Sequence, residues 1–86
     1  MAVYQILYWK HIPAQIRVFD GKKPVSFEMP PRFQQEIDRV AMAEGLAGTD
    51  DYLNHWQWSE KKERPGSAEA VALEILSELE RDYDAL

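Results

Sequence analysis

The chain has 86 residues, a length typical of a single hydrophobic core, so we expect one domain spanning residues 1–86. It contains no cysteine, which excludes disulfide bonds and cysteine-ligated zinc. The formal net charge is −5, and acidic side chains concentrate between Glu69 and Asp84. This charge disfavours nucleic acids and anionic membranes as partners.

The first residues bear on the location of the protein. MAVYQILYWK lacks a basic segment followed by a continuous apolar stretch, so we expect no signal peptide. No apolar run approaches the roughly 20 residues that span a bilayer. We therefore expect a cytoplasmic protein.

The N-terminal third of the chain predicts three strands. Residues 2–9, AVYQILYW, are almost all apolar or aromatic, which is typical of an interior strand. Residues 14–19 alternate between polar and apolar side chains and predict a half-buried second strand. Residues 20–23 carry a turn signal, Asp-Gly followed by two lysines, and residues 25–29 alternate again. Pro24 favours an edge position for this third strand.

The middle of the chain predicts an amphipathic helix that begins near Pro31, a favourable first helical residue. Its apolar positions recur with helical spacing at Phe33, Ile37, Val40 and Ala41. Gly45 followed by Leu46 is typical of a Schellman-type end. Thr49 then suits the N-cap of a short helical turn.

The C-terminal part predicts a fourth strand over His55–Ser59, a charged turn over Glu60–Ser67 and a last helix capped by Ser67. The resulting order, β-β-β-α-β-α, favours an α+β two-layer sandwich: a small, mostly antiparallel sheet with both helices on one face. The other face then needs a different cover. Either Tyr4, Ile6 and Tyr8 or Val3, Leu7 and Trp9 must be covered by loops, a second copy or a partner.

Motifs for catalysis or cofactor binding are weak. The two histidines, His11 and His55, lack metal-ligand spacing, so we expect no metal and no cofactor. No serine lies in a nucleophile-elbow motif, and the glycines of EGLAGT lack the GK[ST] of a phosphate loop. General acid–base chemistry by His55 or Asp51 stays open; the sequence favours a non-enzymatic domain over an enzyme without deciding between them, and it assigns no catalytic residue.

Trp56 and Trp58 share one face of an extended strand, while His55 and Gln57 share the other. Core packing is the ordinary role of two tryptophans in so small a domain. Tryptophan is also enriched at interface hot spots. Both roles are open from the sequence.

Three segments resemble a known family: YQILYWKHIPAQIRV, PPRFQQEIDRVAMAEGLAGTDDYLNHWQW and RPGSAEAVALEILSELE. The most specific pieces are W-x-x-I-P-A-Q at residues 9–15 and G-L-x-G-T-D-D-Y-L at residues 45–53. They are similar to the bacterial virulence factor domain family, which also occurs attached to HEAT-like repeats in a staphylococcal virulence factor. The resemblance implies an intracellular accessory role and brings no assigned reaction.

Two hypotheses follow. The first is a non-catalytic protein-interaction or accessory domain that binds a protein partner or a second copy through an aromatic sheet surface, without nucleic acid or membrane. Its predicted contacts are Tyr4, Tyr8, Trp9, Trp56 and Trp58. The alternative is a small-ligand or enzymatic site between the His11–Pro13 turn and the Gly48–Asp51 loop. Its predicted residues are His11, Asp50, Asp51 and His55.

Overall fold

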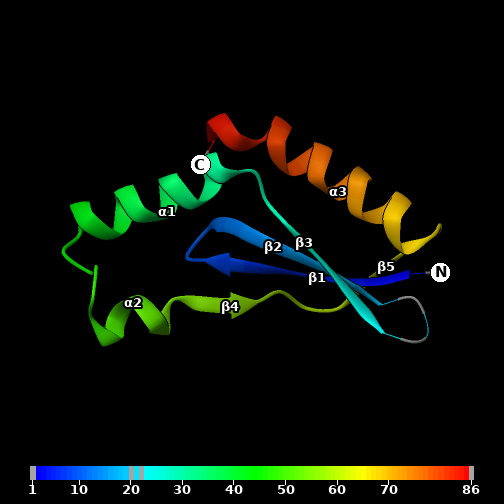
Figure 1. Cartoon of the computed structure of the whole chain (residues 1–86), viewed down its shortest axis with the longest axis horizontal. Coiled ribbons are helices and arrows are strands. Elements are labelled where there is room, and N and C mark those ends of the chain that lie inside the picture. The colour runs from blue at the N-terminus through cyan, green and yellow to red at the C-terminus, as the bar shows by residue number, and fades with distance from the viewer. Residues whose placement is uncertain (1, 20, 22, 86) are drawn as a thin grey trace.

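The computed structural model describes residues 2–19, 21 and 23–85. Its elements are β1 (Ala2–Trp9), β2 (Ile12–Phe19), β3 (Pro24–Glu28), α1 (Pro31–Ala43), α2 (Asp50–Asn54), β4 (Trp56–Trp58), β5 (Lys62–Arg64), α3 (Ala68–Arg81) and the 3-10 helix η1 (Tyr83–Ala85). The two long helices, α1 and α3, lie on the same side of the strands (Figure 1). The predicted α+β class and its helix-on-sheet arrangement are therefore confirmed.

The sheet is antiparallel throughout and has the order β3-β2-β1-β4, with β5 also paired to β1. Along one edge of β1, residues 7–9 pair with β4 and residues 2–4 pair with β5. β1 therefore has neighbours on both sides, as its apolar sequence predicts. β3 lies at the edge of the sheet. An edge strand tolerates Pro24, which has no backbone N–H to donate to a second neighbouring strand.

The β1–β2 pairing contains a bulge. Leu7 pairs with Gln15 but Tyr8 pairs with Pro13, so Ala14 is an extra residue in β2. A bulge bends its strand and increases the local twist. The carbonyl of Ala14 accepts a hydrogen bond from the backbone N–H of Met29 (3.1 Å), which holds the start of the β3–α1 connection against this bend.

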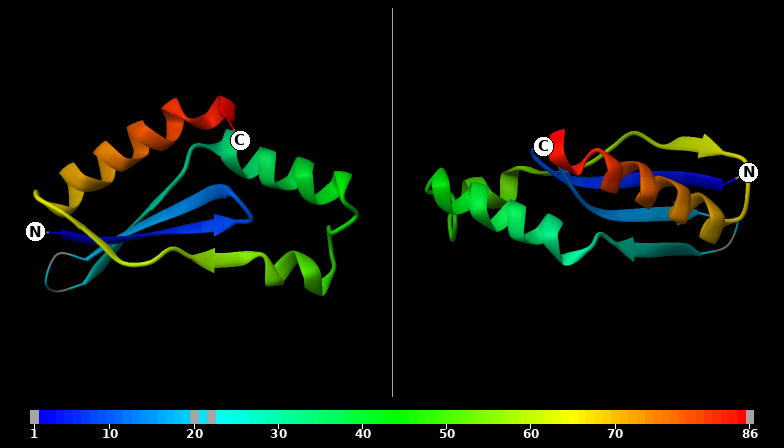
Figure 2. Two further views of the ribbon diagram at one scale, coloured as in Figure 1. Left: turned by 180° about the vertical axis from the view of Figure 1, so that it is seen from behind. Right: turned by 90° about the horizontal axis from the view of Figure 1, so that it is seen from above.

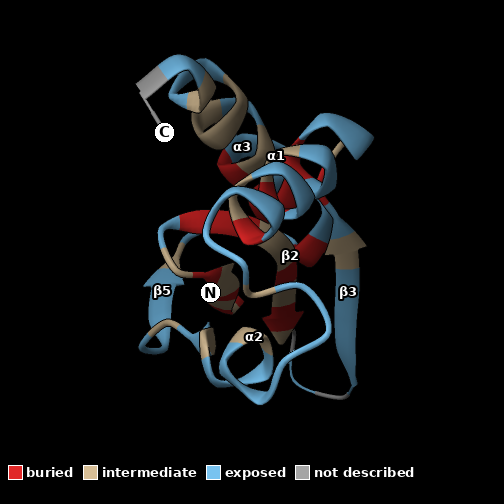
Figure 3. Ribbon diagram, turned by 90° about the vertical axis from the view of Figure 1, so that its left-hand side faces the viewer, coloured by how far each residue is buried: buried red, intermediate tan, exposed pale blue. Residues whose placement is uncertain are grey.

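The core fills the space between the helices and one face of the sheet (Figure 3). The strands contribute Ala2, Tyr4, Ile6, Ile16 and Val18, and the helices contribute Phe33, Ile37, Ala41, Ala68, Val71, Ala72 and Ile75. The helical residues recur at spacings of three and four, which puts them on one stripe of each helix. At the far end, the chain after α3 returns beside the start of α1 (Figure 2), where the rings of Phe33 and Tyr83 pack 4.9 Å apart.

Local sequence signals determine the helix ends. Gly45 has φ +70°, and the N–H groups of Gly45 and Leu46 donate to the carbonyls of Met42 and Ala41, which is the predicted Schellman motif. The hydroxyl oxygens of Thr49 and Ser67 accept from the N–H groups three residues ahead and cap α2 and α3.

Some boundaries differ from the prediction. β2 begins at Ile12 rather than residue 14, because its first residues pair with the end of β1 beyond the bulge. β3 spans Pro24–Glu28, one residue earlier than expected, and Met29 is buried after it. The predicted turn includes Asp20 and Lys22, which lie outside the described residues.

The prediction of a turn throughout Glu60–Ser67 was wrong, because this segment contains β5. Three charged residues show no apolar alternation, so the sequence carries no strand signal here. A tertiary contact holds the segment instead: Arg64 donates to Glu74 (2.8 Å) and to both oxygens of Glu78 (2.6 and 2.7 Å) on α3. These hydrogen bonds also lower the pKa of the Glu78 carboxyl.

None of the described helices has the length and apolar composition needed to cross a membrane.

Candidate functional site

The side of the sheet away from α1 and α3 is called the open face here. Side chains alternate along a strand, so Tyr4 and Ile6 face the helices while Gln5 and Leu7 face the opposite way. Direct pairing adds neighbours from other strands to this side. The open face includes Val3, Gln5, Leu7, Trp9, Gln15, Arg17, Phe19, Trp56 and Trp58. Apart from Trp9, all of these side chains are half-buried or exposed.

Three side chains on the open face, Arg17, Phe19 and Trp58, form a cation–aromatic cluster with Lys61, which lies between β4 and β5. The guanidinium carbon of Arg17 lies 3.9 Å from the ring centroid of Trp58 and 5.5 Å from that of Phe19. The ammonium nitrogen of Lys61 lies 5.2 Å from the Phe19 centroid. Such contacts contribute roughly 0.5–2 kcal/mol each, depending on solvent exposure. The cluster concentrates positive charge and aromatic surface in a chain whose net charge is −5.

Arg17 is the member of this cluster whose side chain has a buried N–H donor without a partner among the described residues. Its side chain forms no ion pair with any residue in the described ranges. Its Nε is shielded from solvent and has no hydrogen-bond partner among those residues. A buried donor without a partner costs about 1–3 kcal/mol. Stacking on Trp58 orients the guanidinium, whose terminal nitrogens carry the other N–H donors of this side chain.

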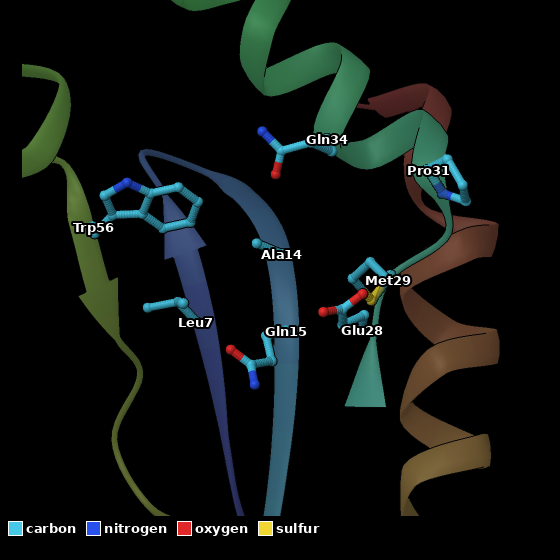
Figure 4. A pocket seen from close by; sticks show the side chains of 8 residues that line it. All are labelled: Leu7, Ala14, Gln15, Glu28, Met29, Pro31, Gln34 and Trp56. Carbon is cyan, nitrogen blue, oxygen red and sulfur yellow. The ribbon is translucent and has the colours of Figure 1, made fainter. Parts of the chain in front are cut away.

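A hollow of about 420 Å³ adjoins the cluster. Its lining residues are Leu7, Ala14, Gln15, Glu28, Met29, Pro31, Gln34 and Trp56. In Figure 4 the indole of Trp56 stands on one side, Glu28 and Met29 on the other, and Gln34 of α1 points in from one end. The lining thus combines apolar side chains with two amides and one carboxylate, a composition typical of pockets that accept an apolar group.

The short helix α2 covers one end of the open face, on the side of the sheet opposite α1 and α3 (Figures 1 and 3). Trp9 is fully buried beneath it, and its indole N–H donates to the carbonyl of Tyr52 (2.8 Å). The ring of Trp9 also packs against Tyr52 and His55, with centroids 5.4 and 5.7 Å apart. Only the part of the open face beyond α2 is therefore free for contact with another molecule.

A family model described as virulence factor matches residues 7–86. The chain belongs to the virulence factor family. No curated protein and no solved structure matched the chain. The family description refers to a phenotype and specifies no reaction, so the function of this family member has to be argued from its surface.

The five aromatic contacts predicted from the sequence occupy different environments in this virulence factor domain. Tyr4 (7% exposed) and Trp9 (0%) are core residues, so neither is available on an interaction surface. Tyr8 shares the helix-facing side with Tyr4, and its pKa is raised, mainly by burial and secondly by Tyr4. Trp56 borders the hollow, and Trp58 is 38% exposed. Of the five predicted contact residues, Trp56 and Trp58 are therefore the ones that lie on the open face without being fully buried. That they bind a partner stays a prediction.

The residues of the alternative site are dispersed in this family member. The start of the β1–β2 turn does contact the end of α2, because the backbone N–H of Lys10 donates to the carbonyl of His55 (3.1 Å). However, His55 packs edge-on against Trp9, while Asp50 and Asp51 lie exposed in the first turn of α2. His11 is exposed in the β1–β2 turn. Within the described residues, no three His, Cys, Asp or Glu side chains form a metal site.

Two residues of the open face, Gln15 and Arg17, were not predicted from the sequence as functional residues of the virulence factor domain. Gln15 and Arg17 are visible in the sequence only as the polar positions of a half-buried strand. Their importance depends on the strand order, which places Trp58 beside Leu7 and brings it over Arg17. Spacing along the chain gives no signal for this contact, since 41 positions separate residues 17 and 58.

Proposed function

We propose that this domain is a non-catalytic interaction module that binds a protein through the open face of its sheet. One observation carries the proposal: an exposed tryptophan, Trp58, stacks on an arginine, Arg17, that has no ionic partner among the described residues. Tryptophan and arginine are the side chains most enriched at interface hot spots. The cytoplasmic location expected from the sequence stays a prediction.

The shape of the surface supports the same proposal. The hollow lies next to the cation–aromatic cluster, because Leu7 and Gln15 line the hollow and Leu7 pairs with Trp58. A pocket that receives an anchoring side chain, flanked by aromatic and cationic groups, is the usual centre of a protein interface. The bound protein is either a different protein or a second copy of this chain.

Trp58→Leu is the variant that tests the proposal, because leucine retains apolar contact with Leu7 but removes the aromatic ring under Arg17. Sedimentation velocity over a range of concentrations measures self-association, and capture from cell lysate measures a different partner. Leu73→Ala is the matched control, because Leu73 is 62% exposed on α3, away from the open face. We expect Trp58→Leu to weaken binding at least tenfold, which is the effect of losing a hot spot.

The Leu73→Ala protein should bind like the unmodified domain. Equal binding by the folded Trp58→Leu variant, or an equal loss in both variants, would show that the open face is not the interface.

A further inference from the structure

We infer that the open face recognises an acidic, extended segment of a partner protein, with a carboxylate on Arg17 and an apolar side chain in the hollow. The inference rests on the proposed function and specifies the chemistry of the partner.

The charge of the cluster indicates what the partner supplies. Arg17 and Lys61 lie over aromatic rings, and neither forms an ion pair with a carboxylate of the described residues. The terminal nitrogens of a guanidinium present two parallel N–H donors that match the two oxygens of a carboxylate. Because Trp58 already holds the guanidinium by stacking, less side-chain freedom is lost when a carboxylate binds.

The spacing of the surface indicates an extended segment. Gln15 lines the hollow, and Arg17 lies two residues further along the same strand, beyond the bulge at Ala14. Two residues of a strand span about 6.6 Å, and side chains two positions apart in an extended peptide have nearly the same separation. A segment in which an apolar residue and an acidic residue are separated by one position therefore reaches both the hollow and Arg17.

Two acidic side chains limit where the partner's carboxylate can lie. Glu28 lines the far side of the hollow, and Glu63 pairs with Val3 on the open face. Both repel a carboxylate, so the favourable position lies between them, at Arg17 and Lys61. The same acids, together with the acidic helix α3, disfavour a nucleic acid, whose regularly spaced phosphates would meet them.

The test uses a displayed library of random peptide segments selected on the immobilised domain, followed by calorimetric titration of the selected peptides. We expect them to share an acidic residue two positions from an apolar one. Arg17→Gln should weaken their binding about tenfold, which is typical of a lost charge-assisted hydrogen-bond pair. Arg17→Lys should reduce the affinity by a smaller factor than Arg17→Gln, because lysine keeps the positive charge but lacks the two parallel N–H donors. Arg81→Gln is the matched control, because Arg81 is an exposed arginine at the end of α3.

The outcomes separate the two proposals. Peptides that lose affinity with Trp58→Leu but not with Arg17→Gln, or that carry no acidic residue, overturn the acidic-segment inference and leave the proposed function intact. Peptides insensitive to both variants, or a library without any binder, overturn both. Tighter binding of a short oligothymidylate than of the selected peptides overturns the inference as well. Circular dichroism confirms that each variant is folded.

Discussion

Replacing Trp9 by phenylalanine should reduce the free energy of unfolding by about 3 kcal/mol. The indole N–H of Trp9 donates to the carbonyl of Tyr52 (2.8 Å), and losing this hydrogen bond costs about 1 kcal/mol. The phenyl ring is also smaller than the fully buried indole, and a deficit of two or three methylene-sized groups costs about 2 kcal/mol. At 0.05–0.15 kcal/mol per residue, the free energy of unfolding of a domain of this size is about 4–13 kcal/mol. The variant therefore stays folded but is clearly less stable.

Urea unfolding followed by far-ultraviolet circular dichroism measures this loss. Trp58→Phe is the control, because Trp58 is 38% exposed and its indole N–H bonds to none of the described residues. We expect a loss below about 1 kcal/mol for the control, since most of the ring contacts survive. A loss below about 1 kcal/mol for Trp9→Phe, or equal losses in both variants, would refute the conclusion that the buried indole of Trp9 and its hydrogen bond to α2 stabilise the fold.

Two further predictions concern the helices. The hydrogen bonds from Arg64 hold the pKa of Glu78 below its ordinary value of 4.5, so this pair stabilises the fold above the unfolded-state pKa, and its contribution is lost as the pH falls through the folded-state pKa. Urea titrations between about pH 7 and pH 3 should therefore show a smaller acid-induced loss of stability for Glu78→Gln than for the unmodified protein, and identical pH profiles would contradict this. Gly45→Ala should cost about 1 kcal/mol, because φ is +70° at Gly45, although an added Cβ meets no atom within 4 Å. Thermal melts should show a smaller loss for Gly45→Asn, and an equal loss would contradict a conformational cause.

Elements with a local cause were predictable from the sequence. The apolar run at residues 2–9 predicts the central strand, because a strand with neighbours on both sides is contacted by apolar residues on both faces. Gly45 and Ser67 mark helix ends through backbone geometry and capping that involve only neighbouring residues. These signals require no knowledge of the tertiary structure.

Features with a tertiary cause were not predictable. β5 depends on the contact of Arg64 with α3, which lies beyond the next turn, and its charged residues carry no strand pattern of their own. The sequence also leaves open which tryptophan is buried. The indole of Trp9 has a partner only because α2 folds over the end of the sheet, whereas Trp58 extends past α2 along the same face.

Arg64 and Arg17 lie on opposite faces of the sheet and have different surroundings, and this contrast supports the proposed interface. On the helix-facing side, Arg64 stacks near Tyr4, with 5.3 Å from guanidinium carbon to ring centroid, and its charge is matched by two carboxylates of α3. On the open face, Arg17 stacks on Trp58 without such a carboxylate among the described residues. A half-buried arginine is stabilised when a carboxylate completes its hydrogen bonds, and of these two arginines only Arg64 has that group among the described residues. A partner's carboxylate on Arg17 would reproduce the arrangement that the domain already uses on its other face.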